Sequence, residues 1–526
     1  MFRTHRRLLA RICIPLQRRF MATEGKDRLL HRVKVLNLPR HENAAIKRLF
    51  QSFELGPFKK APKWEYAFLN FETEGAAQEA MKKLEGVEFK RKTLQTEYMP
   101  VSEEEYRQRF QQKTSTPAVM DEQQKQQEQD TRSPAQRLAD QVTPLHDTAY
   151  EDQLQQKHRR NAKQLANLKR QVAALPTLRS DPDKKTQVAW AFEKENPIQI
   201  LDPIASPEEN GYRTKCEFTM GRDLEGKPTV GFLLGQYRHG FTSVLDPSDC
   251  LHVPRTAKLI AQKMQDYIRA SKYDVYDKVE KKGVWRSLMV KAQRTGDVMI
   301  VIQLKASELD DAQLDAEKKK LVEFWTAQNE IAITTLLVQR WDGESNGFTE
   351  KGVTETLLGD GYVYEELLGC RFRISSSAFF QVNTPATELL YAKCAEWCNI
   401  DKNKKTTLLD LCCGTGTIGI TMARTVDRVI GIEMISDAIV DAQANAEMNQ
   451  IKNVQYHASK VEERIDVVAN EKNEEVVAVF DPPRSGVHSS VIRAVRESPQ
   501  IRKVIFISCD ARQAMDSFVK SLPADV

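Results

Sequence analysis

The chain has 526 residues, 41% of them hydrophobic, which is enough for two to four domains with sizeable cores. Its formal net charge of +5 is modest, so the charge permits a nucleic-acid partner without demanding one. Nine cysteines without a dense, regular framework argue against a disulfide scaffold and for reduced thiols in an intracellular protein, and the absence of an 18-residue apolar run excludes a membrane-spanning helix.

The N-terminal segment, residues 1–30, is basic. Its first 20 residues are rich in arginine, contain no acidic residue and are interspersed with Leu, Ile and Phe, as in a mitochondrial transit peptide. A disordered basic tail explains the composition equally well, and Met21 is an alternative start that would omit it. We therefore expect a protein of the cytosol or nucleus, with the mitochondrion as the alternative.

Residues 31–100 have the pattern of a small α/β domain. Strands are expected where apolar residues line one side, and helices where they recur with helical spacing. The main expected elements are strands at 33–38 and 64–71 and helices at 44–53 and 75–84. The resulting βαββαβ order resembles an RNA-recognition motif, with the two strands on that family's hexamer and octamer.

In that family, strand aromatics stack on RNA bases, and by position Tyr66 and Phe68 would be the stacking pair. The pattern also departs from the family. Lys34 stands where the hexamer usually has an aromatic residue, and Trp64 and Glu65 stand where the octamer usually begins with a basic residue and a glycine. RNA binding is expected, and a protein-binding or purely structural use of the fold remains open because fold does not determine function.

Two connecting segments follow. Residues 101–146 are rich in Gln, Glu, Lys, Thr and Pro, so we expect a disordered linker. Residues 147–195 are expected to form a helical linker, with apolar positions such as Leu165 and Leu168 among many basic residues. Its helix could dock on a domain or face RNA, and a solvated charged surface is the simplest interpretation.

Residues 196–370 are expected to form a β-rich central domain with one helix at 256–270. The expected strands are 212–220, 228–232, 285–290, 297–304, 334–339 and 372–376. Five side chains could contact RNA phosphates or could equally be solvated. They are Arg213, Lys215, Arg222, Tyr237 and Arg238.

The most informative stretch is residues 408–419, an apolar run that ends in Asp410 and breaks into a glycine-rich turn before a helix start. The turn has G-x-G-x-x-G spacing from Gly414, which lets a ligand approach the backbone. A second apolar run, residues 428–432, ends in Glu433, and an acid at this separation typically binds a ribose hydroxyl. This pattern indicates the nucleotide-binding entry of a doubly wound α/β sheet, with an incidental βαβ unit as the alternative.

Two later stretches, residues 479–486 and 504–510, are apolar strands with polar residues at the carboxyl end, where such sheets bind ligands. Together with residues 377–384 and the glycine turn, they closely resemble the RNA (uracil-5-)-methyltransferase family from residue 374 onward. The RNA-binding front end makes the chain most similar to the animal tRNA-modifying members. The resemblance implies a Rossmann-like, S-adenosyl-L-methionine-dependent methyltransferase domain over residues 371–526, and a central domain that helps hold the RNA.

The implied reaction is methylation of uracil C5, with the T-loop uridine at position 54 of tRNA as the target. A duplex buries the C5 and C6 edges, so the uridine must be flipped out or lie in a loop. Because C5 is a poor nucleophile, a thiolate first adds to C6, and a base later removes the C5 proton. The resemblance places the nucleophile at Cys509, whereas Cys412 and Cys413 are poorer candidates because the cofactor turn follows them directly.

The resemblance also implies roles for other residues. Gln381, Gly414 and Glu433 would contact the cofactor, and Asp481 would contact the cofactor or the uracil edge. Arg484 would hold a phosphate or developing enolate charge, with a structural ion pair as the alternative.

Two further observations concern the thiols. Asp510 and Ala511 follow the cysteine where the family usually has Asn-Pro, and a neighbouring carboxylate should raise a thiol pKa. Some relatives carry an iron–sulfur cluster on grouped cysteines, but the cysteines of the central domain are scattered. Cys394 and Cys398 have no second pair at the required spacing, so no metal is expected.

The end of the sequence departs from the family. The family's proton-abstracting glutamate lies in a His-x-Glu-type stretch well after the cysteine, and the sequence stops at Val526, 17 residues past Cys509. Such sheets normally finish with two strands beyond the five expected here, at 407–412, 428–432, 453–457, 476–481 and 503–508, followed by a helix at 510–521. We therefore expect an apparently truncated domain that binds cofactor without efficient turnover.

The leading hypothesis is a monomeric, multidomain α/β enzyme that methylates uracil C5 in tRNA. The rival is a non-catalytic RNA-binding or tRNA-folding protein that retains the methyltransferase shell. A third interpretation keeps the chemistry but directs it to mitochondrial RNA.

Overall fold

The computed structural model of the chain describes two compact units, Met1–Thr131 and Arg132–Val526, which are treated separately below. The described residues are 29–39, 43–53, 55, 58–60, 64–71, 73–90, 92–102, 132–175, 178, 182–193, 198–235, 242–278, 280–345, 347–464, 466–467, 473, 475–483, 486–512 and 514–515. The basic N-terminal segment, most of the predicted linker and most of the predicted helix 510–521 lie outside them, as do Tyr237, Arg238 and Arg484.

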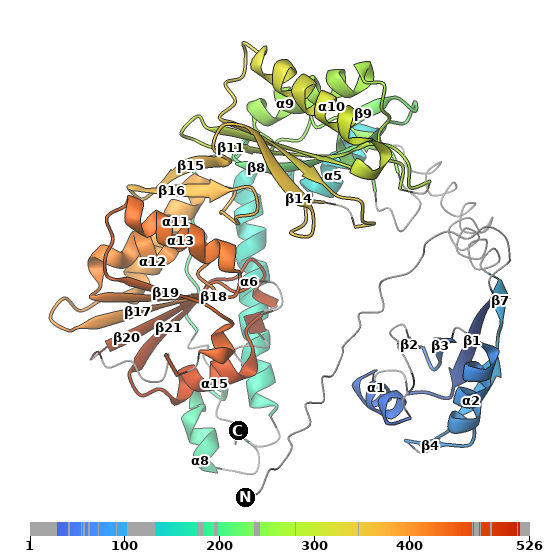
Figure 1. Cartoon of the computed structure of the whole chain (residues 1–526). Helices are drawn as coiled ribbons and strands as arrows, with labels where there is room; N and C mark the ends of the chain where they lie inside the picture. The colour runs from blue at the N-terminus through green and yellow to red at the C-terminus, as the bar shows by residue number, and fades with distance from the viewer. Residues whose placement is uncertain are drawn as a thin grey trace, which may run out of the picture. The chain divides into compact units, whose positions relative to one another are not determined.

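The first unit is an antiparallel sheet with two helices on one face (Figure 1). Its elements are β1 (Leu29–Leu36), α1 (Asn43–Ser52), β2 (Phe58–Lys59), β3 (Ala67–Phe71), α2 (Glu74–Leu84), β4 (Glu88–Phe89), β5 (Lys92–Thr93), β6 (Gln95–Tyr98) and β7 (Val101–Ser102). The main strands lie in the order β2-β3-β1-β6, and β7 also pairs with β1. The predicted βαββαβ order is confirmed, although the second predicted strand begins at Ala67 rather than at residue 64.

Alternation along β1 and β3 explains why this sheet has one buried and one open face. Val33 and Val35 on β1 and Ala67 and Leu69 on β3 are buried against the helices. Phe68 lies opposite Lys34 in the antiparallel register, so both side chains are on the other face.

The prediction of a disordered linker up to residue 146 is wrong for residues 132–146. Ser133 caps helix α5 (Pro134–Val142) through a capping box with Gln136, and Pro134 occupies the first turn. Leu138 is buried in the core of the central domain. The polar composition therefore concealed this helix. Its capping box starts the helix, and Leu138 packs it against the central domain.

The predicted β-rich central domain is confirmed as a seven-stranded sheet in the order β10-β9-β8-β11-β12-β13-β14. The strands are β8 (Lys215–Arg222), β9 (Pro228–Leu233), β10 (Val244–Leu245), β11 (Trp285–Ala292), β12 (Val298–Leu304), β13 (Thr335–Arg340) and β14 (Val353–Leu358). Helices α9 (Arg255–Ala270) and α10 (Asp311–Thr326) contribute to the core on one face of this sheet. Residues 306–308 form the 3₁₀ turn η3 (Ala306–Glu308).

The predicted domain boundary at residue 370 divides a hairpin in two and is therefore wrong. Strands β15 (Tyr362–Leu367) and β16 (Cys370–Ser375) pair with each other and stay outside the central sheet. Their side chains join the core that includes Leu408 and Val429 of the C-terminal sheet. The same core also includes Met289, Met299 and Val301 of the central sheet, so the hairpin packs against both domains.

The C-terminal domain is a doubly wound sheet of five parallel strands in the order β19-β18-β17-β20-β21, which confirms the five predicted strands. They are β17 (Thr406–Leu411), β18 (Arg428–Glu433), β19 (Val454–Ala458), β20 (Glu475–Phe480) and β21 (Ile501–Phe506). Its helical elements are α11 (Thr384–Cys398), α12 (Thr417–Met422), η4 (Ala423–Thr425), α13 (Ser436–Met448), η5 (Val461–Glu463) and α15 (Ser489–Glu497). Helices α11–α13 cover one face and α15 the other (Figure 1). Because the five strands are parallel, their carboxyl ends lie on one edge of the sheet, where such sheets bind ligands.

The predicted basic helix is confirmed as α6 (Tyr150–Ala173), but its interpretation as a solvated surface is wrong for one side. Leu168 and Val172 are buried with α8 (Pro182–Gln187) and η1 (Ala189–Ala191) nearby, and against Ala514 and Met515 of the C-terminal domain. Across the described ranges, no helix combines the length and apolar character needed to cross a bilayer.

Candidate cofactor and catalytic site

The glycine turn after β17 forms a tight backbone cradle. The backbone amides of Cys412 and Cys413 both donate to the carbonyl of Ile432, which folds the turn onto the end of β18. Gly416 has a φ of 79°, and a Cβ atom there would lie 2.5 Å from the hydroxyl of Tyr456. The turn therefore requires glycine at this position for two reasons, backbone conformation and space.

Asp410 lies beneath this turn and was not among the predicted site residues. Its side chain is fully buried, and its Oδ2 accepts a hydrogen bond of 2.8 Å from the amide of Gly419. Its Oδ1 has no hydrogen-bond partner within the described part of the chain. Burial, with a smaller effect from the charges of Asp481 and Glu433, raises the pKa of Asp410 to about 7.

Glu433 reaches across from β18 to the same turn. Its Oε2 accepts from the amide of Gly414 at 3.2 Å, and its Oε1 accepts from the amide of Ile435 at 3.0 Å. The structure thus brings together Gly414 and Glu433, which the sequence assigned to one cofactor site. A carboxylate held at this place is suited to accept hydrogen bonds from a ribose.

Gln381 and Asp481 form a second pair, from two segments 100 residues apart. The side-chain amide of Gln381 donates to Oδ2 of Asp481 at 3.5 Å, a long hydrogen bond. Burial raises the pKa of Asp481 to about 6, and the Gln381 hydrogen bond opposes this rise. The charge of Asp481 also acts on Asp410, so the two pairs share one electrostatic environment.

Lys291 anchors the loop that carries Gln381, and sequence analysis missed it. This lysine on β11 is 2% exposed, and its Nζ donates to the carbonyls of Ser375 at 2.6 Å and Ala378 at 3.0 Å. Burial lowers its pKa to about 7. The amide of Thr214 on the central domain also donates to the carbonyl of Val382, so the central domain fixes this loop from both sides.

Asn445 on α13 connects the β15–β16 hairpin to the glycine turn. It is fully buried. Its Oδ1 accepts from the amide of Arg373 at 2.7 Å, and its Nδ2 donates to the carbonyl of Thr415 at 3.2 Å. One turn earlier, Asp441 pairs with the guanidinium of Arg373 at 2.9 Å. This helix therefore holds the cofactor turn through one buried amide.

Cys509 follows β21 and is the one residue classed as exposed among the eight described cysteines. Because Phe480 pairs with Phe506 in the parallel register, the segments after β20 and β21 lie side by side. Cys509 thus shares the ligand-facing edge with Asp481. Burial raises the pKa of Cys412 to about 12 and also raises the pKa of Cys413, which leaves both as poor nucleophiles.

The carboxylate beside Cys509 is neutralised locally. Arg512 donates to Asp510 from Nη2 at 2.7 Å and from Nε at 3.2 Å. These hydrogen bonds lower the pKa of Asp510 to about 2, and the charge of Arg160 on α6 adds to the effect. The ion pair with Arg512 and the charge of Arg160 thus balance the negative charge of Asp510. The sequence predicts that the proton-abstracting glutamate is missing from the end of the chain. Residues 516–526 lie outside the described part of the structure, so this stays a prediction.

The open face of the sheet in the first unit carries an aromatic group. The rings of Tyr66 and Phe68 lie 5.5 Å apart, and Trp64 stacks on Tyr66 at 4.7 Å. Lys34 lies 5.2 Å above the Tyr66 ring, and Arg32 lies 5.0 Å from the Phe68 ring. Aromatic rings flanked by cations are the side chains that single-stranded RNA-binding sheets present to bases and phosphates.

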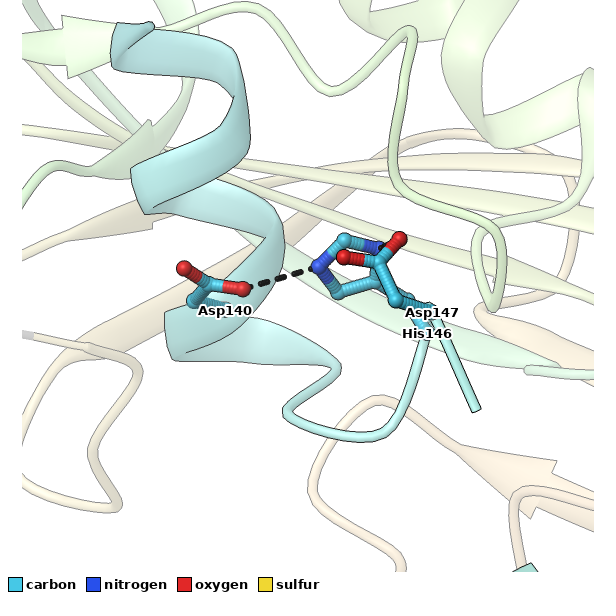
Figure 2. Close-up of side chains that lie close together, drawn as sticks. All are labelled: Asp140, His146 and Asp147. Atoms are coloured by element: carbon cyan, nitrogen blue, oxygen red, sulfur yellow. Dashed lines mark hydrogen bonds and ion pairs between the residues drawn. The ribbon is translucent and has the colours of Figure 1, made fainter. Parts of the chain in front are cut away.

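One group in the described residues has the ligand types of a metal site (Figure 2). His146 contacts Asp140 through Nε2 and Asp147 through Nδ1, both at 2.9 Å. Arg132 also pairs with Asp140 at 2.5 Å. The members thus satisfy one another, and we assign the cluster a structural role, tying the end of α5 to the turn that precedes α6.

Comparisons with known proteins agree with this geometry. The family model described as tRNA (Uracil-5-)-methyltransferase matches residues 212–522. The human tRNA (uracil-5-)-methyltransferase homolog A is 33% identical over 503 residues, which cover 93% of this chain and 76% of the relative. Homolog B from Danio rerio is 34% identical over 379 residues, covering 71% of this chain and 76% of the relative.

Among solved structures, the chain is similar to Pyrococcus abyssi tRNA (uracil-54, C5)-methyltransferase in complex with S-adenosyl-L-homocysteine. The sequences are 19% identical and the TM-score is 0.48, with 60% of this chain and 69% of the other covered.

Proposed function

The chain belongs to the tRNA (uracil-5-)-methyltransferase family, and we propose that it transfers the methyl group of S-adenosyl-L-methionine to C5 of a uracil in tRNA. One observation carries the proposal. The glycine turn with Glu433, the Gln381–Asp481 pair and the exposed Cys509 all lie on the ligand-facing edge of one parallel sheet. This edge combines a cofactor cradle with the one class of nucleophile that the chemistry requires.

The residues at the turn fit the proposed cofactor. No atom lies within 4 Å of the place that a Cβ of Gly414 would take, so the backbone there is open to a ligand, and Glu433 can accept from ribose hydroxyls. The buried Oδ1 of Asp410 has no partner in the described chain, as expected of a polar atom that a ligand or water completes. When bound, S-adenosyl-L-methionine supplies an electrophilic methyl carbon attached to a sulfonium sulfur.

Cys509 supplies the nucleophile. Its thiolate forms a bond to C6 of the uracil, and the electron pair of the C5–C6 double bond moves to C5. C5 then bonds to the methyl carbon, and the sulfonium–carbon bond breaks to leave S-adenosyl-L-homocysteine. Removal of the C5 proton by a base re-forms the double bond and expels the Cys509 thiolate, so the enzyme is regenerated.

We assign the remaining predicted residues as follows. Gln381 contacts the cofactor, Asp481 contacts the cofactor or the uracil edge, and Arg484 contacts phosphate or the developing enolate. The target is the T-loop uridine at position 54, whose C5 and C6 edges become accessible when the base leaves the loop. Single-stranded RNA stacks on Tyr66 and Phe68 of the first unit, a role supported by the cations beside both rings.

The test is product formation on defined tRNA. Unmodified transcripts with U54 or with C54 are incubated with the full chain and cofactor, digested to nucleosides and analysed for 5-methyluridine by mass spectrometry. The proposal predicts 5-methyluridine on the U54 transcript and none on the C54 control or with Cys509→Ala. Tight tRNA binding by the wild-type chain without any product would favour the non-catalytic RNA-binding alternative.

A further inference from the structure

Helix α6 has an unusual distribution of charge. Its acidic residues, Glu151 and Asp152, lie in the first turn. From Gln153 to the end of the helix there are six lysine or arginine residues and no acid. These cations are Lys157, Arg159, Arg160, Lys163, Lys169 and Arg170. A helix that is only solvated usually carries acidic residues that balance its cations, because i,i+4 ion pairs then stabilise it. Helix α6 has none after its first turn.

The structure holds this helix in place at both ends. Near the start, the Gln153 amide donates to the carbonyls of Leu145 and Thr148, and the Tyr150 hydroxyl accepts from the amide of Ser206 at 2.7 Å. Near the end, Lys169 donates to the carbonyl of Glu193 at 2.7 Å. The cations are thus presented from a fixed rod rather than from a mobile tail.

The helix also lies against the segment that carries the nucleophile. Leu165 and Leu168 belong to one apolar cluster with Ala511, Ala514 and Met515, which lie two to six residues after Cys509 in the chain. The charge of Arg160 acts on Asp510, the residue after the cysteine. In Figure 1, α6 runs as one long helix beside the C-terminal sheet. Part of the basic surface is therefore adjacent to the place where the target base must enter.

We propose that a stripe of α6 formed by Lys157, Arg160 and Lys163 binds phosphates of the tRNA that flank the target uridine. The three residues are spaced three apart, which places them on one oblique ridge of the helix surface. All three are exposed, and Lys157 and Lys163 form no ion pair within the described chain. The inference rests on the proposed function and adds a tRNA contact that lies outside residues 212–522, the part matched by the family model.

The partner is an RNA because of where the charge lies. A phosphate backbone is a continuous polyanion, and lysine and arginine side chains along a rigid stripe neutralise successive phosphates. Extruding a base costs unstacking energy, and phosphate contacts beside the extruded nucleotide can offset this cost. A surface beside Cys509 is suited to this purpose, whereas the cations on the far edge of the sheet are not.

The test compares two variants that lose the same charge. The stripe variant carries Lys157→Gln, Arg160→Gln and Lys163→Gln in the full chain. The control variant carries Lys402→Gln, Lys404→Gln and Lys405→Gln, which are exposed and precede β17 at the opposite edge of the sheet. Affinity for an unmodified tRNA transcript is measured by fluorescence anisotropy at several salt concentrations, and S-adenosyl-L-homocysteine binding by calorimetry.

The stripe variant is expected to bind tRNA on the order of tenfold more weakly at physiological salt, and its slope of log K against log salt should fall by about 2–3. Cofactor affinity and melting temperature should match the wild type, and the control variant should keep the wild-type slope. Arg160→Lys alone should retain tRNA affinity, because it keeps the charge.

Equal affinity and salt slope for the stripe variant and the control variant would overturn the inference. Weak tRNA binding that appears only with a lowered melting temperature or weakened cofactor binding would also overturn it, since the helix would then act only as a structural support. The outcome is separable from the proposed function. A wild-type chain that makes 5-methyluridine while the stripe variant binds normally refutes the stripe alone, and a wild-type chain that makes none refutes the function.

Discussion

Replacing Asn445 with alanine should weaken cofactor binding without any direct contact being lost between protein and cofactor. The side chain is fully buried and satisfies two backbone groups, the amide of Arg373 and the carbonyl of Thr415 in the glycine turn. The substitution leaves both unsatisfied at about 1–3 kcal/mol each, so the free energy of unfolding should fall by about 2–6 kcal/mol.

The loss of the hydrogen bond to the Thr415 carbonyl should also weaken cofactor binding. The freed carbonyl lets the glycine turn shift, so the free energy of cofactor binding should weaken by about 1–3 kcal/mol. This corresponds to a Kd for S-adenosyl-L-homocysteine that is raised by about 5- to 150-fold. Calorimetric titration measures this directly, at a temperature where urea denaturation shows the variant to be folded.

Asn449 provides a matched control on the same helix. It makes two hydrogen bonds with the backbone of Arg371 on the hairpin and does not reach the glycine turn. Because its site is only partly buried, Asn449→Ala should cost about 1–3 kcal/mol of stability and leave the Kd unchanged. An unaltered Kd in folded Asn445→Ala would refute the reasoning that this amide positions the turn.

Three further predictions concern single residues at the same edge. Gly416→Ala should abolish detectable cofactor binding in calorimetry, since its φ of 79° and a Cβ atom 2.5 Å from the Tyr456 hydroxyl both oppose a side chain; wild-type affinity would contradict this. Asp410 has a folded-state pKa raised to about 7, so its contribution to stability is present below pH 4 and is lost as the pH rises through 7. In urea denaturation, Asp410→Asn should therefore gain stability relative to the wild type by up to about 4 kcal/mol between pH 4 and 8, and parallel pH profiles would show the reasoning to be wrong. Lys291→Met removes both hydrogen bonds that the ammonium group donates to the Gln381 loop. It should raise KM for S-adenosyl-L-methionine about tenfold in steady-state kinetics while the Kd for tRNA stays constant; equal KM values would exclude this positioning role.

The sequence predicted the parallel sheet well because its strands are buried on both faces. Residues 428–433 and 475–480 are nearly continuous apolar runs, and such runs followed by Gly, Glu or Asp-Pro have few other interpretations. The strand ends that carry the glycine turn, Glu433 and Asp481 were therefore visible before the fold. Helix α10 was not, because its three consecutive lysines at 318–320 interrupt the apolar spacing.

The residues that position the site were invisible for a different reason. Lys291 and Asn445 are polar residues within a strand and a helix, and nothing nearby in the sequence marks them. Their partners lie 84 and 72 residues away, at Ser375 and Arg373, so their function exists only once the chain has folded. Helix α5 was missed because composition was weighed above its N-terminal capping signal.

The most direct test of the account is covalent trapping. The full chain, or Cys509→Ala as control, is incubated with tRNA containing 5-fluorouridine and S-adenosyl-L-methionine, and the products are separated on a denaturing gel. Fluorine at C5 cannot leave as a proton, so the adduct between Cys509 and C6 should accumulate. The account predicts a stable protein–tRNA species that requires both Cys509 and the cofactor. No adduct under conditions where the wild-type chain binds tRNA, or an adduct of equal yield with Cys509→Ala, would contradict it.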